Sequence, residues 1–152
     1  MEIFFIFIII IFIIFFGGYW IIKAIKKAQF NEELERVFND SKTLTIQEFL
    51  ELREKTIRMG GESEYDRSEV YVIFNKDSKM YYVGQSINLI KRVNNHFTGK
   101  GNGDVYADYK YGAEFEITLI PCHQNDLNKV EKHYIEFFNA YGKGYNKNKG
   151  NR

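Results

Sequence analysis

The amino-acid sequence predicts an α+β domain in which a small, mainly antiparallel sheet of three strands is flanked by helices. A transmembrane helix and one or two short helices are expected to precede this domain. Two observations support the prediction: a long apolar run at the N-terminus, and β-rich runs followed by segments with helical periodicity. With 152 residues, 45% of them apolar, the chain can bury one ordinary core, which excludes a disordered protein and a multi-domain assembly.

Residues 3–22 form the apolar run, which has no charged or strongly polar side chain and is long enough to cross a hydrocarbon core of about 30 Å as a helix. Tyr19 and Trp20 suit a membrane interface. Three lysines follow by position 27, so the positive-inside rule places the N-terminus outside and the rest of the chain in the cytoplasm. A cleaved signal peptide is the alternative, but Glu2 stands where a basic start is expected. We expect a single-pass anchor in the cell membrane.

The composition divides the remainder of the chain. We expect three parts, which are the anchor with its basic flank (1–28), an acidic helical lead-in and linker (29–69) and a compact domain (70–152). Apolar spacing predicts helices over 29–39 and 45–59, and Thr45 with Glu48 fits a capping box for the second. The formal net charge of +1 indicates no nucleic-acid partner by itself, but residues 70–152 carry twelve basic and eight acidic side chains.

The compact domain has a clear order of elements. We expect strands over 70–74 and 80–84 joined as a hairpin, a helix capped by Ser86, a loop over 98–112, a strand over 114–120 and a helix over 126–141. Alternation along the second strand sends Tyr81 and Tyr82 to opposite faces of the sheet. In the helix that follows Ser86, Arg92 and His96 are four residues apart and project from the same side.

Glu131 interrupts the apolar stripe of the last predicted helix. Burial of an ionised carboxylate without a partner is costly, so a cation, an arginine or a strong hydrogen-bond donor should face it. A structural salt bridge, for example with Arg92, and a position at the solvent-exposed rim are the alternatives to a functional role.

These residues together resemble the GIY-YIG nuclease family. Glu69-Val70-Tyr71 stands where the family has Gly-Ile-Tyr, and Tyr82-Val83-Gly84 stands for Tyr-Ile-Gly. From Gly84 the sequence continues with the spacing G-x-S-x-x-L-x-x-R-x-x-x-H, in which the last two positions are Arg92 and His96. Glu131 and Asn146 match the acid and the asparagine that follow in the family. The resemblance covers about half of the chain and departs from the family at Glu69 and Val83.

The resemblance implies a divalent-metal-dependent endonuclease that hydrolyses phosphodiester bonds in DNA. It implies that Glu131 holds one cation per active site, Mg²⁺ or Mn²⁺, because carboxylate oxygen suits these ions and leaves water positions for the substrate. Arg92 suits a bidentate, permanently charged contact with the scissile phosphate.

The remaining site residues would transfer protons or hold water, phosphate or a strand in place. Tyr71 is expected to be the general base, with Tyr82 orienting water or phosphate. A phenol with a pKa near 10 is almost fully protonated at pH 7, so the pKa of Tyr71 must be lowered or its proton passed on. His96 would relay that proton or contact phosphate, and Asn146 would hold a strand or a phosphate oxygen.

DNA is the expected partner of this domain. Nearby lysines could follow the nucleic-acid backbone; they are Lys91, Lys100, Lys110 and Lys147. No separate sequence-reading module is visible, so we expect weak sequence preference or a protein partner that supplies targeting. An anchored nuclease would meet DNA as it enters the cell. Two alternatives stay open: a membrane-tethered DNA-binding module without cleavage activity, and a small membrane-associated interaction protein that uses the acidic segment.

Overall fold

The computed structural model describes the backbone of residues 2–60 and 69–150, and the side chains of these ranges from residue 16 onward. The chain divides into two compact units, Met1–Val37 and Phe38–Arg152.

The first unit consists of helix α1 (Glu2–Asp40), whose last residues belong to the second unit. The apolar segment and the predicted helix over 29–39 are therefore parts of one uninterrupted helix of 39 residues. Several large apolar side chains of α1 are exposed, among them Trp20 and Ile21. Among the helices whose side chains are described, none is long and apolar enough to cross a membrane. The side chains of residues 3–15, which make up most of the predicted span 3–22, lie outside the described residues.

The second unit is built on an antiparallel sheet of four strands, so the prediction of three strands is wrong by one. The strands are β1 (Lys42–Thr45), β2 (Glu69–Asn75), β3 (Tyr81–Ser86) and β4 (Phe115–Pro121), in the spatial order β1-β4-β2-β3. Strand β1 has four residues, and only Leu44 among them is apolar. Its place in the sheet depends on pairing with β4, including a hydrogen bond of 2.9 Å between the hydroxyls of Thr43 and Thr118, and no local pattern signals such pairing.

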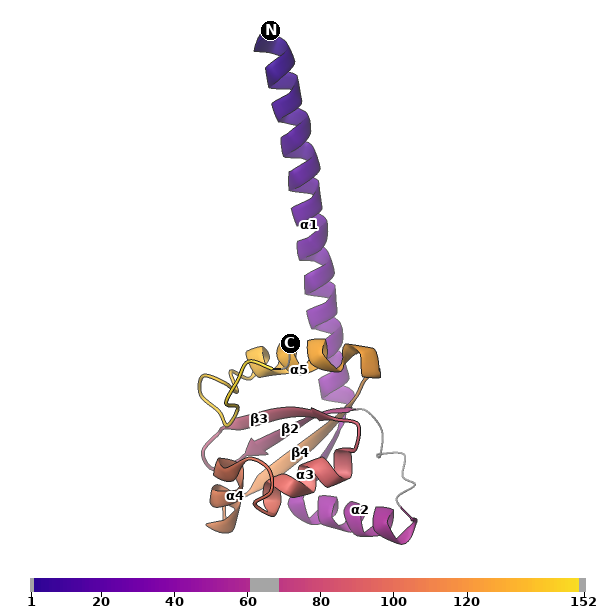
Figure 1. Cartoon of the computed structure of the whole chain (residues 1–152), viewed down its shortest axis with the longest axis vertical. Helices are drawn as coiled ribbons and strands as arrows, with labels where there is room; N and C mark the ends of the chain where they lie inside the picture. Colours follow the sequence, from indigo (N-terminus) through magenta and orange to yellow (C-terminus); the bar gives the residue numbers. More distant parts are fainter. Residues whose placement is uncertain (1, 61–68, 151–152) are drawn as a thin grey trace. The chain divides into compact units, whose positions relative to one another are not determined.

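Four α-helices besides α1 are described, together with the short 3₁₀ turn η1 (Gln124–Asp126). They are α2 (Ile46–Arg58), α3 (Leu89–Phe97), α4 (Gly103–Lys110) and α5 (Leu127–Phe137). The capping box of Thr45 and Glu48 is confirmed at the start of α2. In Figure 1, α5 covers one face of the sheet, and α2, α3 and α4 lie on the other face.

Two predicted helix boundaries and one predicted loop need correction. Ser86 is the last residue of β3, and the N-cap of α3 is Asn88, whose side chain accepts the amide of Lys91. The predicted loop over 98–112 contains α4. The N-cap of this helix is Asn102, whose side chain accepts hydrogen bonds from the backbone amides of Asp104 and Val105. Helix α5 ends at Phe137 and not at residue 141, because Asn139 adopts a left-handed backbone with φ of 49°.

The main core lies between the sheet and the helices α2 and α3. It includes Tyr71 and Ile73 of β2, Val93 of α3 and Phe49 of α2. The segment predicted as a lead-in (29–69) therefore contributes strand β1 and the core helix α2 to the same folded unit that contains the β2–β3 hairpin.

We predict that Phe49→Ala lowers the free energy of unfolding by about 3 to 5 kcal/mol, because the Phe49 ring is fully buried in the core of the sheet. Urea denaturation of the full chain in detergent measures the change. Ile57→Ala on the same helix is the control, because this side chain is 59% exposed and should change stability by no more than about 0.5 kcal/mol. Equal effects of the two substitutions would contradict the assignment of α2 to the core.

Candidate active site

The candidate site lies at the outer edge of the sheet, where β3 has a neighbour on one side only. Tyr71 of β2 stands opposite Gly84 of β3, so both positions face α3. Tyr82 also faces α3, and its ring packs on His96 with 4.4 Å between the ring centroids. Tyr81 points to the opposite face, where its ring stacks on Phe138, as strand alternation predicts.

Gly84 makes room for the Tyr71 side chain. A Cβ atom at position 84 would lie 2.5 Å from Cζ of Tyr71 and would overlap its hydroxyl. The glycine of the Tyr-Val-Gly sequence is therefore required by the close approach of a phenol, since the backbone of Gly84 is not in the left-handed region.

His96 of helix α3 contacts Tyr71 of β2 and Tyr82 of β3. Its Nε2 atom lies 2.8 Å from the hydroxyl of Tyr71, and its Nδ1 atom accepts the backbone amide of Asn102 at 2.9 Å. The imidazole has no exposed surface. Burial first, and the positive charge of Arg92 second, lower the pKa of His96 to about 4, so the ring is neutral at pH 7.

The two phenols have raised pKa values for the same main reason. Burial raises the pKa of Tyr71 well above its usual value, and the neighbouring Tyr82 raises it further. Burial also raises the pKa of Tyr82. The guanidinium of Arg92 acts against burial at both phenols, because a positive charge favours the phenolate.

Glu131 reaches the same edge from α5 on the other face of the sheet. Its side chain is 7% exposed, and its Oε2 accepts a hydrogen bond of 2.9 Å from the Nε2 amide of Gln85. The same Gln85 nitrogen donates to Oδ1 of Asn128 at 2.6 Å. The negative charge of Glu131 is close enough to raise the pKa of Tyr82, so the carboxylate and this phenol are electrostatic neighbours. We call Tyr71, Tyr82, Arg92, His96 and Glu131 the edge site.

The donor set of the edge site fits a cation that keeps most of its water. In the part of the chain that the structure describes, no group of three or more His, Cys, Asp or Glu side chains could hold a metal ion. A closed, fully protein-bound metal centre is therefore absent from those residues. One buried carboxylate held by an amide suits Mg²⁺ or Mn²⁺, which binds through one or two carboxylates together with water and substrate oxygens.

Asn146 fixes the strand that carries Tyr82 and Gly84. Its Oδ1 accepts the amide of Val83 and its Nδ2 donates to the carbonyl of Val83, both at 2.8 Å. These backbone groups face away from β2 and would otherwise be exposed at the sheet edge. Of the two uses predicted for Asn146, the structure places its amide on the strand.

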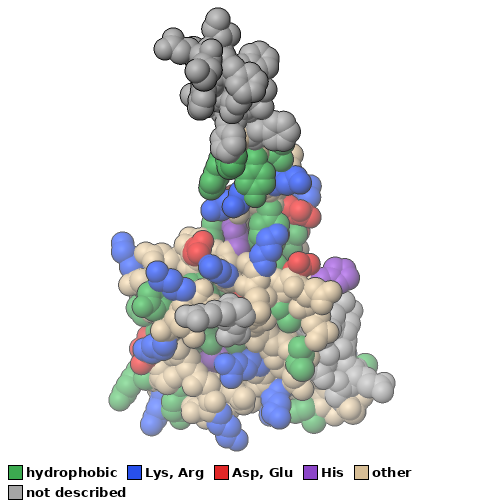
Figure 2. Space-filling view, turned by 45° about the horizontal axis from the view of Figure 1, so that its top comes forward, with side chains coloured by type: hydrophobic (Ala, Val, Ile, Leu, Met, Phe, Trp, Pro, Cys, Tyr) green, Lys and Arg blue, Asp and Glu red, His purple; other side chains and the backbone are tan. Residues whose placement is uncertain are grey.

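The lysines predicted to bind nucleic acid are spread over the second unit. Lys91 lies on α3, Lys100 follows α3, and Lys110 ends α4; all three are exposed. Lys147 forms an ion pair with Asp104. The lower body in Figure 2 displays more Lys and Arg side chains than Asp and Glu side chains, without a single concentrated basic patch.

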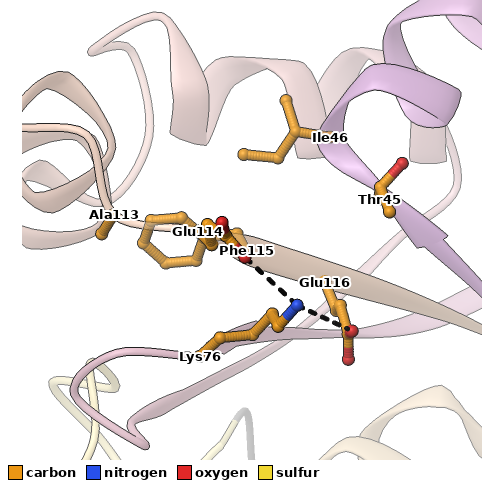
Figure 3. A pocket seen from close by; sticks show the side chains of 7 residues that line it. All are labelled: Thr45, Ile46, Lys76, Ala113, Glu114, Phe115 and Glu116. Carbon is orange, nitrogen blue, oxygen red and sulfur yellow. Dashed lines mark ion pairs between the residues drawn. The ribbon is translucent and has the colours of Figure 1, made fainter.

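A separate pocket lies beside β1 and β4, and none of its lining residues belongs to the edge site (Figure 3). Its charged groups pair with each other, since Lys76 lies 3.2 Å from Glu114 and 3.8 Å from Glu116. This pocket shows no group aimed at a ligand.

Sequence reasoning brought forward all members of the edge site but missed two residues that support it. Gln85 directly follows the Tyr-Val-Gly sequence, and strand alternation could have placed it on the α5 face. Asn102 acts on His96 through its backbone, and only the N-cap pattern Asn-Gly-Asp before α4 could have drawn attention to it.

One comparison with known families bears on this arrangement. The family model described as the GIY-YIG catalytic domain matches residues 68–146, which are 79 of the 152 residues. Neither the curated proteins nor the solved structures provide a match. The matched range contains every residue of the edge site and Asn146.

We predict that Gly84→Ala destabilises the second unit by about 1 to 3 kcal/mol, because the new methyl group would overlap the Tyr71 hydroxyl and force backbone or ring displacement. Urea denaturation measures the effect. Gly103→Ala is the matched control, because nothing lies within 4 Å of a Cβ at that helix start. A Gly84→Ala protein as stable as the control would show that Tyr71 does not occupy this position.

Proposed function

We propose that this chain, which belongs to the GIY-YIG family of nucleases, is a divalent-metal-dependent DNA endonuclease that cuts at the edge site. The family consists of endonucleases, which are phosphodiester hydrolases, so a nucleic-acid backbone is the expected substrate. The observation that carries the proposal is the meeting of two phenols, a neutral imidazole, a guanidinium and a buried carboxylate at one strand edge.

Arg92 has the chemistry and the accessibility for binding the scissile phosphate. It is the exposed member of the edge site, and its charge already acts on both phenols. A guanidinium can donate two parallel hydrogen bonds to phosphate oxygens and stays charged at any physiological pH. Arg92 would therefore place the phosphate beside the tyrosine pair and stabilise the negative charge that develops on its oxygens.

The tyrosine pair is the source of the general base. Tyr71 has no exposed surface, whereas Tyr82 is half-buried, so Tyr82 is the phenol that can meet a water molecule directly. The two rings are neighbours, with 6.1 Å between their centroids, and each phenol affects the pKa of the other. We therefore assign the general base to Tyr82 in place of Tyr71, the base expected from the resemblance. The Tyr82 hydroxyl would first lose its own proton to solvent, and the phenolate oxygen would then take a proton from the attacking water, with Tyr71 behind it.

Glu131 is the residue that would hold the divalent cation, and Gln85 would keep its carboxylate in place. When bound, such a cation neutralises charge on phosphate oxygens and lowers the pKa of bound water. Gln85 donates one amide hydrogen to Glu131 and also contacts Asn128, one helical turn earlier. This arrangement limits rotation of the carboxylate without changing its charge.

We predict that Glu131→Gln lowers plasmid nicking by at least about 100-fold, because the amide keeps the size of the side chain but loses the charge that holds a cation. The assay incubates purified full-length protein in detergent with supercoiled plasmid and Mg²⁺ or Mn²⁺, and EDTA should abolish nicking. Glu136→Gln, an exposed position on the same helix, is the control and should leave nicking unchanged.

DNA binding by the same preparations separates this proposal from its main alternative. Glu131→Gln should bind plasmid about as well as the unchanged protein, because Arg92 and the surface lysines remain. If the unchanged protein binds DNA but does not nick it with either metal, the chain is a DNA-binding module and the endonuclease proposal is wrong.

We further propose that residues 3–22 hold the nuclease in the cell membrane, with the N-terminus outside and the catalytic domain in the cytoplasm. Support comes from the uncharged sequence of this stretch, from the three lysines that follow it and from the exposed apolar side chains between Phe16 and Ile25. An endonuclease in that place would meet DNA entering the cell, with a protein partner as one source of targeting.

The anchor proposal predicts that the full chain stays in the membrane fraction after alkaline carbonate extraction. Ile9→Arg combined with Ile10→Arg should release it, because each arginine near the centre of a span costs about 2.5 to 3.5 kcal/mol. Ile57→Arg, on the exposed surface of α2, should not. Protease added to intact spheroplasts should leave the catalytic domain uncut. Release of the unchanged protein by carbonate would overturn the anchor without affecting the nuclease proposal.

A further inference from the structure

His96 lies between two hydrogen-bonding groups, of which one can only donate and the other can donate or accept. On one side, its Nδ1 lies 2.9 Å from the backbone amide of Asn102, and on the other, its Nε2 lies 2.8 Å from the hydroxyl of Tyr71. A backbone amide can only donate, whereas a phenol can donate or accept. The amide therefore decides which ring nitrogen of His96 carries the lone pair.

The geometry gives one tautomer for the neutral ring. Nδ1 must be unprotonated to accept the Asn102 amide, so the single hydrogen of a neutral imidazole is on Nε2. That hydrogen points to the Tyr71 oxygen, which makes Tyr71 the acceptor in this bond. His96 in this state has no free lone pair with which to take a proton from Tyr71.

The surroundings of His96 keep the ring neutral. Within residues 16–60 and 69–150, the groups that face it are Tyr71 from β2, Tyr82 from β3, Arg92 from its own helix and the amide of Asn102. None of these is a carboxylate that could stabilise an imidazolium. Full burial and the Arg92 charge lower the pKa of His96 to about 4, which agrees with the neutral ring that the hydrogen bonds require.

The loop that delivers the amide is built for this contact. A Cβ at Gly101 would lie 2.8 Å from Nδ1 of His96, so a larger residue there would push the loop away. The side chain of Asn102 donates to the carbonyl of Tyr145 at 2.7 Å. Its Oδ1 also accepts the amides of Asp104 and Val105 at 3.0 and 3.1 Å. Asn102 is thus held on both sides while its own amide points at the imidazole.

We propose that Asn102 is a positioning residue whose backbone amide fixes His96 as a hydrogen-bond donor to Tyr71, so that His96 stabilises negative charge on the tyrosine pair and does not act as the base that deprotonates it. This inference rests on the proposed endonuclease function for its catalytic meaning, but the tautomer itself does not. Since Tyr71 accepts from His96, its own hydrogen is left for another acceptor, and the Tyr82 ring lies beside it with 6.1 Å between the ring centroids. A bond from Tyr71 to Tyr82 would extend the donor chain from His96 to the phenol that faces the water.

Nitrogen NMR of the full chain in detergent micelles tests the tautomer directly. With ¹⁵N-labelled histidine at pH 7, the unchanged protein should show His96 protonated on Nε2 only. Asn102→Pro removes the amide hydrogen, and the φ of −78° at this position suits proline. This variant should show a mixture of tautomers or protonation on Nδ1. Asn102→Ala loses the same side-chain contacts but keeps the amide, so it should retain the Nε2 form.

Each result of this experiment decides the proposal. Protonation of Nδ1 in the unchanged protein would overturn it, and so would an Nε2 form that persists unchanged in a folded Asn102→Pro protein. If Asn102→Pro does not fold, the spectrum of the unchanged protein still decides the tautomer. None of these measurements depends on nicking, so a failed endonuclease proposal remains distinguishable from a failed tautomer assignment.

Substitution of His96 tests the donor role by activity. The amide nitrogen of His96→Gln can replace Nε2–H as a donor to Tyr71 but cannot take up a proton. We expect His96→Gln to nick plasmid about tenfold faster than His96→Ala, with His96→Asn, whose shorter amide does not reach Tyr71, similar to alanine. Glutamine and alanine variants of equal activity would overturn the donor role.

Discussion

The hydroxyl of Tyr71 occupies space that only glycine at position 84 leaves open, and the edge site depends on this close approach. The pairing register of β2 and β3 places the two residues opposite each other, so the contact is built into the hairpin. Because Tyr71 packs directly on the backbone of Gly84, its hydroxyl oxygen lies within hydrogen-bond distance of Nε2 of His96. The same register puts Tyr82 next to the imidazole ring.

The edge position of β3 explains how residues from both faces of the sheet can serve one reaction. A central strand would separate the side chains of α3 from those of α5, but an edge strand lets them meet around its free side. Asn146 satisfies the outward backbone groups of Val83, while Gln85 links the end of the strand to Glu131. Asn146 thus covers the outward backbone groups of β3 at Val83, and the edge site lies beside them. Because these backbone groups are already hydrogen-bonded, the edge is less able to pair with a strand of another molecule.

The electrostatics of the edge site favour uncharged groups before substrate binds. Burial raises the pKa of both phenols and lowers that of His96, while the Arg92 charge favours phenolate formation. A site of this kind holds its protons until additional positive charge or a reorganised hydrogen-bond network shifts the balance. The hydrogen bonds that join the Asn102 amide to His96, and His96 to Tyr71, are the part of this network that the protein itself supplies.

The sequence by itself determined the hairpin, the capping box of α2 and the residue types of the edge site, because strand alternation, helix capping and motif spacing act over short distances. Only the tertiary structure decided that β1 joins the sheet, that Gln85 holds Glu131 and that the Asn102 amide reaches His96. The contacts of β1 and Gln85 join residues far apart in the chain, and that of Asn102 uses a backbone group, so no side-chain pattern records any of the three.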